Sequence, residues 1–355
     1  MKAAIISPYF NTLGGGERYA LTFAEALLKK GWTVDVTLKD KETINKAAKR
    51  FNLLLDGVNN RQYDDFTQGT LISRYVLQKK YDLLFWVSDG SIPLMFGKKN
   101  LLHFQVPFQN VNGKKLSNKL KLKLVDRIIC NSFFTKRVIE KEYGVKGEVW
   151  YPPVSVEGFF PGKKENIILA VGRFEKSLTE KRQDILIETF KKIINKGLKN
   201  WELIIVGGCS TDESKNEILN DLKNRAKGLP VEIKVNLPFL ELKQLYAKSK
   251  IFWHAAGYGA DEEKNPEKVE HFGMTTVEAM VAGCVPIVIN KGGQKEIIND
   301  GKDGFLWEKV DDLINLTLKV INDDKIMNNF SASAIKKSRD FSKEKFYEKI
   351  YNIIK

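Results

Sequence analysis

Short apolar segments alternate with longer amphipathic segments along most of the chain. Apolar runs bounded by polar or glycine-containing stretches are typical of strands buried on both faces, as in a parallel sheet covered by helices. In the first half of the chain, the strands predicted in this way are residues 3–7, 33–38, 83–87, 100–104, 127–130 and 148–151. A helix is predicted between the first two strands, opening at glycines 14–16 and ending near Lys30. The pattern indicates an α/β domain.

The alternation breaks at Pro152 and Pro153, which lack amide donors and suit a linker. A second series follows, with strands predicted at residues 166–172, 201–208, 250–255 and 285–289, a helix at 182–196, and three helices from about residue 309. We therefore expect two doubly wound Rossmann-like domains, 1–153 and 154–340, and a C-terminal helix at 341–355 that packs back toward the N-terminal domain. Ligands bind at the carboxyl ends of strands in such sheets, so we expect the site in a cleft between the domains.

The bulk composition fits this picture. A chain of 355 residues exceeds the size at which one hydrophobic core stops growing, and 43% apolar with 29% charged residues is ordinary for a globular protein. The longest apolar run, residues 81–88, is too short to cross a bilayer. The N-terminus lacks the layout of a signal peptide. We expect a cytoplasmic protein, at most peripheral on the inner face of a membrane.

The net charge of +14 fits nucleic acid, an anionic membrane surface or anionic substrates as partners. No nucleic-acid-binding motif accompanies the charge, so nucleic acid is not expected. Lysines spread along the chain also fit a merely solvated surface. Residues 114–123 mix leucine with lysine, a pattern typical either of a membrane-interface segment or of an ordinary amphipathic surface helix.

No pattern in the sequence indicates a metal-binding site. The cysteines, Cys130, Cys209 and Cys284, are widely separated and lie in or beside apolar runs, so we expect buried, reduced thiols. Neither they nor the three histidines have the spacing of metal ligands. We expect no metal site.

Glycines 14–16, followed by Glu17, come directly after the first predicted strand. Glycine lets the backbone approach a ligand closely, and the amides of the following helix favour phosphate. A loose turn is the alternative. The segment is neither a Gly-x-Gly-x-x-Gly fingerprint nor a P-loop.

Two cations follow the strand predicted at residues 166–172. Arg173 lies just past it, and Lys181 lies where the next helix begins. Together they could hold a diphosphate, the arginine through its bidentate fork. Taken singly, each is equally well explained as exposed charge.

Two carboxylates flank a predicted helix start, Glu270 before it and Glu278 within it. Glu270 sits in a charged loop, where a carboxylate can accept hydrogen bonds from sugar hydroxyls, and Gly273 and Met274 could offer backbone amides. Glu278 has an alternative role, because Thr275 precedes it at the spacing of a capping box.

His103 ends a predicted strand and could donate to a sugar hydroxyl or a phosphate. A satisfied core histidine is the competing interpretation.

These motifs resemble those of retaining, nucleotide-sugar-dependent glycosyltransferases of family 4, which have the GT-B fold. The similarity extends over nearly the whole chain, and the specific segment is Glu-His-Phe-Gly-x-x-x-x-Glu-Ala-Met-x-Ala-Gly-x-x-Pro, from Glu270 to Pro286. It looks most like the branch of mannosyltransferases that extend lipid-linked oligosaccharides.

The resemblance implies a role for each matching residue of the C-terminal half. Arg173 and Lys181 would bind the donor diphosphate, and Glu270 would meet the donor sugar. The backbone of Phe272, Gly273, Met274 and Thr275 would surround sugar and phosphate, and Glu278 would hydrogen-bond the ribose. The segment between the two cations is longer than in many members, so Lys176 is an alternative to Lys181.

In the N-terminal half, the resemblance implies that Gly15 and Gly16 approach the diphosphate and that His103 lies near the transferred sugar. The activity implied is hexosyl transfer from a GDP- or UDP-sugar to a glycan or a lipid-linked saccharide, with retention of configuration and without a metal or other cofactor.

Three rival functions remain open. A Rossmann-type oxidoreductase would need the Gly-x-Gly-x-x-Gly fingerprint that the first loop lacks. Another GT-B enzyme, an epimerase or a phosphorylase, would share the fold. An inactive transferase-like partner subunit would be expected to have lost donor-site residues, whereas Arg173, Lys181, Glu270 and Glu278 are all present.

Overall fold

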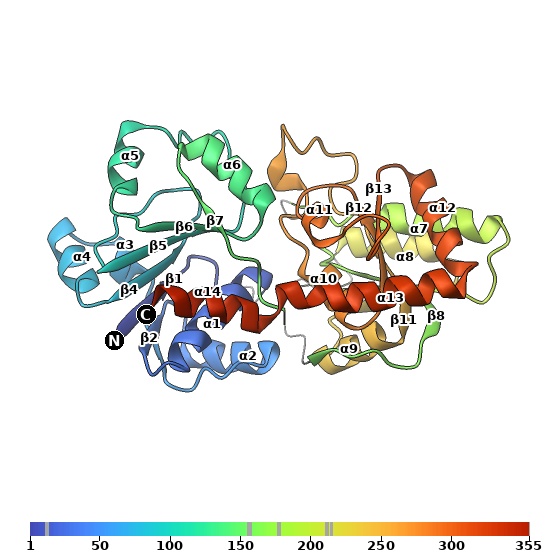
Figure 1. Cartoon of the computed structure of the whole chain (residues 1–355), viewed down its shortest axis with the longest axis horizontal. Coiled ribbons are helices and arrows are strands. Elements are labelled where there is room, and N and C mark those ends of the chain that lie inside the picture. The colour runs from blue at the N-terminus through green and yellow to red at the C-terminus, as the bar shows by residue number, and fades with distance from the viewer. Residues whose placement is uncertain (11–13, 155–157, 176–178, 210–212, 214–215, 355) are drawn as a thin grey trace. The chain divides into compact units, whose positions relative to one another are not determined.

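The computed structural model describes residues 1–10, 14–154, 158–175, 179–209, 213 and 216–354. The chain forms two compact units, one made of Met1–Pro153 with Lys343–Lys355 and the other of Val154–Ser342 (Figure 1). Each is an α/β unit built on one parallel sheet, as predicted.

The first unit has a seven-stranded sheet in the order β3-β2-β1-β4-β5-β6-β7, and every neighbouring pair is parallel. Its strands are β1 (Lys2–Ile6), β2 (Thr33–Val36), β3 (Val58–Asn60), β4 (Leu83–Val87), β5 (Lys99–Phe104), β6 (Arg127–Cys130) and β7 (Glu148–Val149). β3 is absent from the prediction because an edge strand of sequence Val-Asn-Asn carries no apolar run.

Helices cover both faces of this sheet. One apolar layer contains side chains of α1 (Gly15–Leu28), α2 (Lys41–Phe51) and α14 (Lys343–Ile353). The opposite layer contains side chains of α3 (Asp64–Thr67), α4 (Leu71–Gln78), α5 (Leu116–Leu122) and α6 (Phe133–Tyr143). The buried Glu25 of α1 accepts hydrogen bonds from Tyr347 and Lys343, so polar contacts as well as apolar ones hold α14 on α1.

The second unit has a six-stranded parallel sheet in the order β10-β9-β8-β11-β12-β13. Its strands are β8 (Glu165–Val171), β9 (Glu202–Gly207), β10 (Val231–Val235), β11 (Ser249–His254), β12 (Val285–Ile289) and β13 (Phe305–Trp307). Its helices are α7 (Gln183–Asn195), α8 (Glu217–Ala226), α9 (Phe239–Lys248), α10 (Met274–Val281), α11 (Gln294–Ile297), α12 (Val310–Ile321) and α13 (Asp324–Ser338).

The strand order of the second sheet reverses between β8 and β11. Successive strands β8, β9 and β10 run outward to one side, and β11, β12 and β13 run to the other. The crevice at such a switch point is where open α/β sheets bind ligands. Arg173 follows the carboxyl end of β8, and His254 is the last residue of β11. Because β8 and β11 are parallel neighbours, both residues lie where the strands of the sheet end.

Cys130, Cys209 and Cys284 are free and buried, as predicted. Within the part of the chain that is described, none of the helices has the length and apolar character needed to span a bilayer.

Candidate active site

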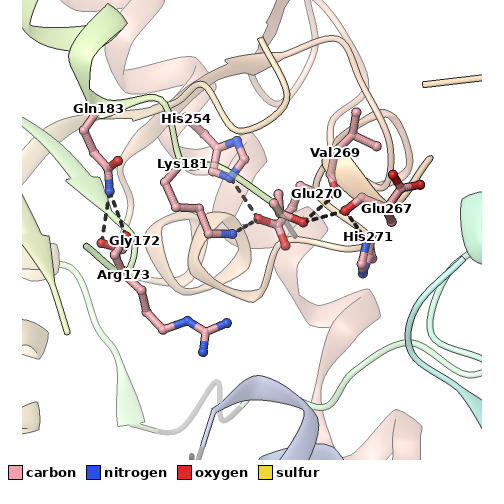
Figure 2. Close-up of polar contacts among 10 residues, drawn as sticks. Gly172, Arg173, Lys181, Gln183, His254, Glu267, Val269, Glu270 and His271 are labelled. Atoms are coloured by element: carbon pink, nitrogen blue, oxygen red, sulfur yellow. Dashed lines mark hydrogen bonds and ion pairs between the residues drawn. The ribbon is translucent and has the colours of Figure 1, made fainter. Parts of the chain in front are cut away.

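The centre of the candidate site is the Glu270 carboxylate (Figure 2). Lys181 Nζ lies 2.6 Å from Glu270 Oε2, and His254 Nε2 lies 3.3 Å from the same oxygen. Lys181 comes just before α7, His254 ends β11, and Glu270 closes the long loop after β11. Three segments that are distant in sequence therefore meet at one oxygen atom.

The charge state of this cluster follows from its surroundings. Burial by itself raises the pKa of Glu270, but the positive charge of Lys181 and the hydrogen bond from His254 outweigh burial and hold the pKa well below its usual value. Burial lowers the pKa of His254, and its contact with Glu270 compensates only in part. Glu270 is thus ionised and His254 is neutral near pH 7, with His254 Nε2 donating its hydrogen.

The second oxygen of Glu270 is available. Both contacts fall on Oε2, and Oε1 has no hydrogen bond or ion pair with any residue that the structure describes. In Figure 2 the two dashed lines to this carboxylate converge on one oxygen. An ionised carboxylate with one fixed and one open oxygen is suited to accept a hydrogen bond from a ligand hydroxyl.

Arg173 supplies a second cation near this edge. The backbone carbonyls of Gly172 and Arg173 accept hydrogen bonds from Gln183 Nε2 at 3.2 and 3.3 Å, which fixes the chain where it leaves β8. The Arg173 side chain is exposed and, among the described residues, its guanidinium makes no hydrogen bond or ion pair. It is therefore free to bind an anion.

The residues on both sides of Lys181 are tied to the loop that carries Glu270. Thr179 Oγ1 donates toward the carbonyls of Glu267 and Val269 at 3.0 and 3.2 Å, and Arg182 Nη1 donates to the Tyr258 carbonyl at 2.7 Å. These contacts hold Lys181 beside Glu270. Lys176, the alternative phosphate ligand, lies outside the described residues.

At the start of α10 the backbone has a conformation that would let a ligand come close to it. Gly273 precedes the helix with φ +118°, a conformation that other residues rarely adopt, and no side chain caps the helix. Met274 and Thr275 form its half-buried first turn. Because Thr275 lies inside the helix and Gly273 is the cap, the capping-box interpretation of Thr275 and Glu278 is wrong.

The loop that leads into α10 packs tightly against Gly293, and this packing leaves no room for a larger residue at position 293. The Gly293 amide donates to the Glu270 carbonyl at 2.8 Å. A Cβ on Gly293 would lie 2.5 Å from the His271 carbonyl oxygen, so only glycine fits. Phe272 is buried and packs edge-on against Phe341, with ring centroids 5.5 Å apart. These contacts fix the backbone that leads from Glu270 into α10.

Glu278 lies on α10 and is buried. Tyr246 of α9 donates its hydroxyl hydrogen to Glu278 Oε2 at 3.2 Å. A buried carboxylate that is not a helix cap needs polar partners, and Tyr246 is one of them.

The remaining predicted residues belong to the first unit. Gly15 and Gly16 open α1, and the carboxylate of Glu17 accepts a hydrogen bond from the Gly14 amide at 2.8 Å. The Gly16 carbonyl accepts from Gln105 Nε2 at 3.2 Å, and a Cβ on Gly16 would collide with that side chain. The glycine is therefore explained by a contact inside the unit.

His103 is fully buried in the first unit. Its ring stacks on Tyr19 with centroids 4.1 Å apart, and Nδ1 lies 3.2 Å from the Ile129 carbonyl oxygen. Burial lowers its pKa to about 3, so the ring is neutral. Nε2 has no hydrogen-bond partner among the described residues. The structure thus shows a core histidine with one satisfied and one unsatisfied nitrogen.

His254 is the residue that the sequence did not single out. Its position at the end of a strand was the only available signal, and that signal is shared by many residues with no role in a site.

For metal binding, the described residues contain no cluster of three or more histidine, cysteine, aspartate or glutamate side chains placed to hold an ion.

Comparison with known structures establishes the fold class. The structure of a glycosyltransferase from Rickettsia africae is similar, with a TM-score of 0.78 and 18% identity. The alignment covers 99% of this chain and 97% of the Rickettsia chain. Anabaena HepE, solved with UDP and glucose, covers 100% of this chain and 99% of its own, with a TM-score of 0.75 and 16% identity. The two parallel-sheet units have the GT-B fold, as the sequence predicted.

The chain belongs to the family of glycosyl transferases group 1, whose model matches residues 157–337, half of the chain. A second model, described as Glycosyltransferase Family 4, matches residues 13–157. The predicted family is confirmed.

Curated relatives include lipid-linked-oligosaccharide mannosyltransferases. The GDP-Man:Man(3)GlcNAc(2)-PP-Dol alpha-1,2-mannosyltransferase of Xenopus laevis is 31% identical over 45% of this chain and 34% of its own length. Its Mus musculus counterpart is 25% identical over 86% of this chain and 76% of its own. A mannosylfructose-phosphate synthase of Agrobacterium fabrum is 26% identical over 60% of this chain and 49% of its own length. For the first four relatives, the matched part spans only 33% to 47% of their length.

Proposed function

We propose that this protein is a retaining, metal-independent hexosyltransferase that moves a sugar from a nucleoside diphosphate to a glycan or lipid-linked saccharide. The observation that carries the proposal is the half-open Glu270 carboxylate, with Oε2 bound by Lys181 and His254 and Oε1 left without a described partner. It pairs a hydrogen-bond acceptor for a sugar hydroxyl with the cation of Lys181.

The cations serve the leaving group. As the bond from the anomeric carbon to the diphosphate breaks, negative charge grows on the phosphate oxygens. Arg173, Lys181 and the first amides of α10 are positioned before the reaction, so little reorganisation is needed as the charge develops. The Lys181 ammonium has three donor hydrogens and can keep Glu270 while it binds a phosphate oxygen. In this role the positive side chains replace a metal ion.

Glu270 orients the sugar and does not act as an acid. Its low pKa keeps it ionised, so it has no proton to donate, and the open oxygen can accept from a hydroxyl of the donor sugar. The backbone from Phe272 to Thr275 lies around sugar and phosphate. Glu278, on the same helix, accepts a hydrogen bond from the ribose.

Retention follows if the acceptor attacks from the face that the leaving group occupies. The departing phosphate oxygen then takes the proton of the acceptor hydroxyl, so no separate protein base is required. The proposal assigns the acceptor to the first unit, residues 1–153.

The relatives favour a mannosyl donor. Several are named as GDP-Man-dependent mannosyltransferases acting on lipid-linked oligosaccharide, so we propose GDP-mannose as the first donor to test. UDP-sugars come next, because HepE was solved with UDP-glucose. A lipid-linked acceptor would place the protein peripherally on the cytoplasmic face of a membrane.

The test is turnover of a panel of GDP-, UDP- and ADP-sugars, with and without saccharide acceptors, followed by NMR of the product anomer. We expect one donor to be consumed with retention, also in the presence of EDTA, and consumption to be abolished in Glu270→Gln. Phosphate-dependent release of a sugar phosphate would indicate a phosphorylase instead. Donor consumption that is unchanged in Glu270→Gln would overturn the proposal.

A further inference from the structure

Two helices of the first unit present apolar side chains to solvent. On α4, Leu71, Ile72, Tyr75 and Val76 are 53%, 76%, 46% and 53% exposed. On and just after α5, Leu116, Leu120 and Leu124 are 71%, 56% and 37% exposed. Single exposed apolar residues need no explanation, but a helix whose apolar residues face outward together does.

Both helices belong to the same layer of the unit. Leu77 of α4 and Leu122 of α5 pack inward on one apolar cluster that covers one face of the sheet. The exposed residues of α4 and α5 therefore lie on the solvent side of that layer. We call them the outer helix surface: Leu71, Ile72, Tyr75, Val76, Leu116, Leu120 and Leu124.

Basic residues border the outer helix surface, and acidic residues are missing from the same segments. Residues 68–81 contain Arg74, Lys79 and Lys80 and no acidic residue. Residues 113–125 contain five lysines, Lys114, Lys115, Lys119, Lys121 and Lys123, and again no acidic residue. Four of these five lysines are exposed, and Lys121 is half-buried.

We propose that the outer helix surface binds the surface of an anionic lipid bilayer, with its apolar side chains among the acyl chains and its lysines at the phosphates. Charge complementarity identifies the binding partner, because an anionic bilayer has both an apolar interior and a continuous layer of negative charge at its surface. Long lysine side chains can reach the head groups while leucines insert. The inference does not depend on the proposed transferase activity, because it rests on residues of the first unit, whereas Glu270, Lys181 and Arg173 belong to the second.

Vesicle co-sedimentation of the full chain tests the proposal. We expect the protein to sediment with vesicles of phosphatidylcholine plus phosphatidylglycerol, to remain in solution with phosphatidylcholine alone, and to be released by raised salt. The apolar variant is Ile72→Glu with Val76→Glu, and the charge variant is Lys115→Gln with Lys119→Gln. Since each basic residue near such a surface contributes roughly a fivefold gain in affinity, the charge variant should bind about 25-fold more weakly.

Matched controls come from the second unit. Leu240 is 68% exposed, so Leu240→Glu removes a comparable apolar residue, and Lys191→Gln with Lys192→Gln removes two exposed lysines of α7. Both controls should bind vesicles as the wild type does. The proposal is overturned if the wild type does not sediment, if it binds neutral vesicles equally well, or if the controls lose as much binding as the outer-helix variants. The last outcome would mean that net charge alone drives association.

Discussion

Lys181 Nζ lies 2.6 Å from Glu270 Oε2 across 89 residues of sequence, and this contact joins the two halves of the proposed donor site. The lysine keeps the carboxylate ionised despite burial. The carboxylate in turn fixes the position of the Lys181 ammonium, whose side chain is 20% exposed. Each residue therefore prepares the other for the ligand.

Removing either cation should slow the chemical step. We expect Arg173→Ala and Lys181→Ala each to lower kcat by a factor of about 10²–10³, the loss typical when one preorganised donor is removed from a developing anion. Single-turnover assays with saturating donor measure the effect. Lys191→Ala, at an exposed position on α7, is the matched control and should leave kcat unchanged. Near-normal turnover in both cation variants would contradict the assignment.

His254 should act through Glu270. In His254→Ala the Glu270 carboxylate loses one of the two groups that fix Oε2. We expect the affinity for a nucleotide sugar to fall at least about tenfold, as for loss of one hydrogen bond to a charged group, and the affinity for the free nucleoside diphosphate to be unchanged. Calorimetric titration of both ligands gives the comparison. Equal losses for both ligands would show that His254 supports the fold and not the sugar subsite.

Gly273 should tolerate no side chain. Its φ is +118°, and a Cβ would lie 3.0 Å from Cδ of Gln294. Gly197 is the matched control, because it has φ +100° and nothing within 4 Å of the Cβ position. Gly197→Ala should lower the free energy of unfolding by about 1–2 kcal/mol through backbone strain alone. Gly273→Ala should cost more and should also weaken donor binding. Equal costs in chemical denaturation would contradict the packing argument.

The stability of the protein should fall on acidification through its buried histidines. The pKa of His103 is lowered from 6.5 to about 3, so between these values the unfolded chain binds a proton that the folded chain does not. The free energy of unfolding then decreases as pH falls, by up to about 1.4 kcal/mol per pH unit for one such group. His254 adds to this effect, and Glu270 contributes only below its usual pKa.

His103→Phe isolates the larger contribution, because phenylalanine preserves the stacking on Tyr19 but cannot take up a proton. We expect denaturation curves from pH 6.5 to 4.5 to show a shallower pH dependence in the variant than in the wild type. The same slope in both proteins would show that His103 is not the group responsible.

The fold was largely predictable because most strands are continuous apolar runs, which local composition reveals. The strands that the prediction lacked are short or half-buried: β3 contains two asparagines, β10 alternates charged with apolar residues, and β13 is only three residues long. All three lie at an edge of their sheet. Lys181 and Glu270 could be singled out because each stands beside a recognisable strand end or helix start.

The environments of the site residues could not be predicted in the same way. His254 becomes significant only because the loop after β11 returns Glu270 to it, a nonlocal contact. His103 lies in the core because Tyr19, from a helix many residues earlier, stacks on it. Glu278 fits the spacing of a capping box, yet a glycine two residues before Thr275 caps the helix.

The most direct test of the account is a calorimetric titration of the wild type, Arg173→Ala and Lys181→Ala with GDP, UDP and ADP. If Arg173 and Lys181 bind the donor pyrophosphate, the wild type should bind at least one of the three nucleotides. Each variant should then bind that nucleotide at least about tenfold more weakly while remaining folded, since charge-assisted hydrogen bonds contribute this much. Undiminished nucleotide binding in both variants, or no binding of any nucleotide by the wild type, would contradict the donor site described above.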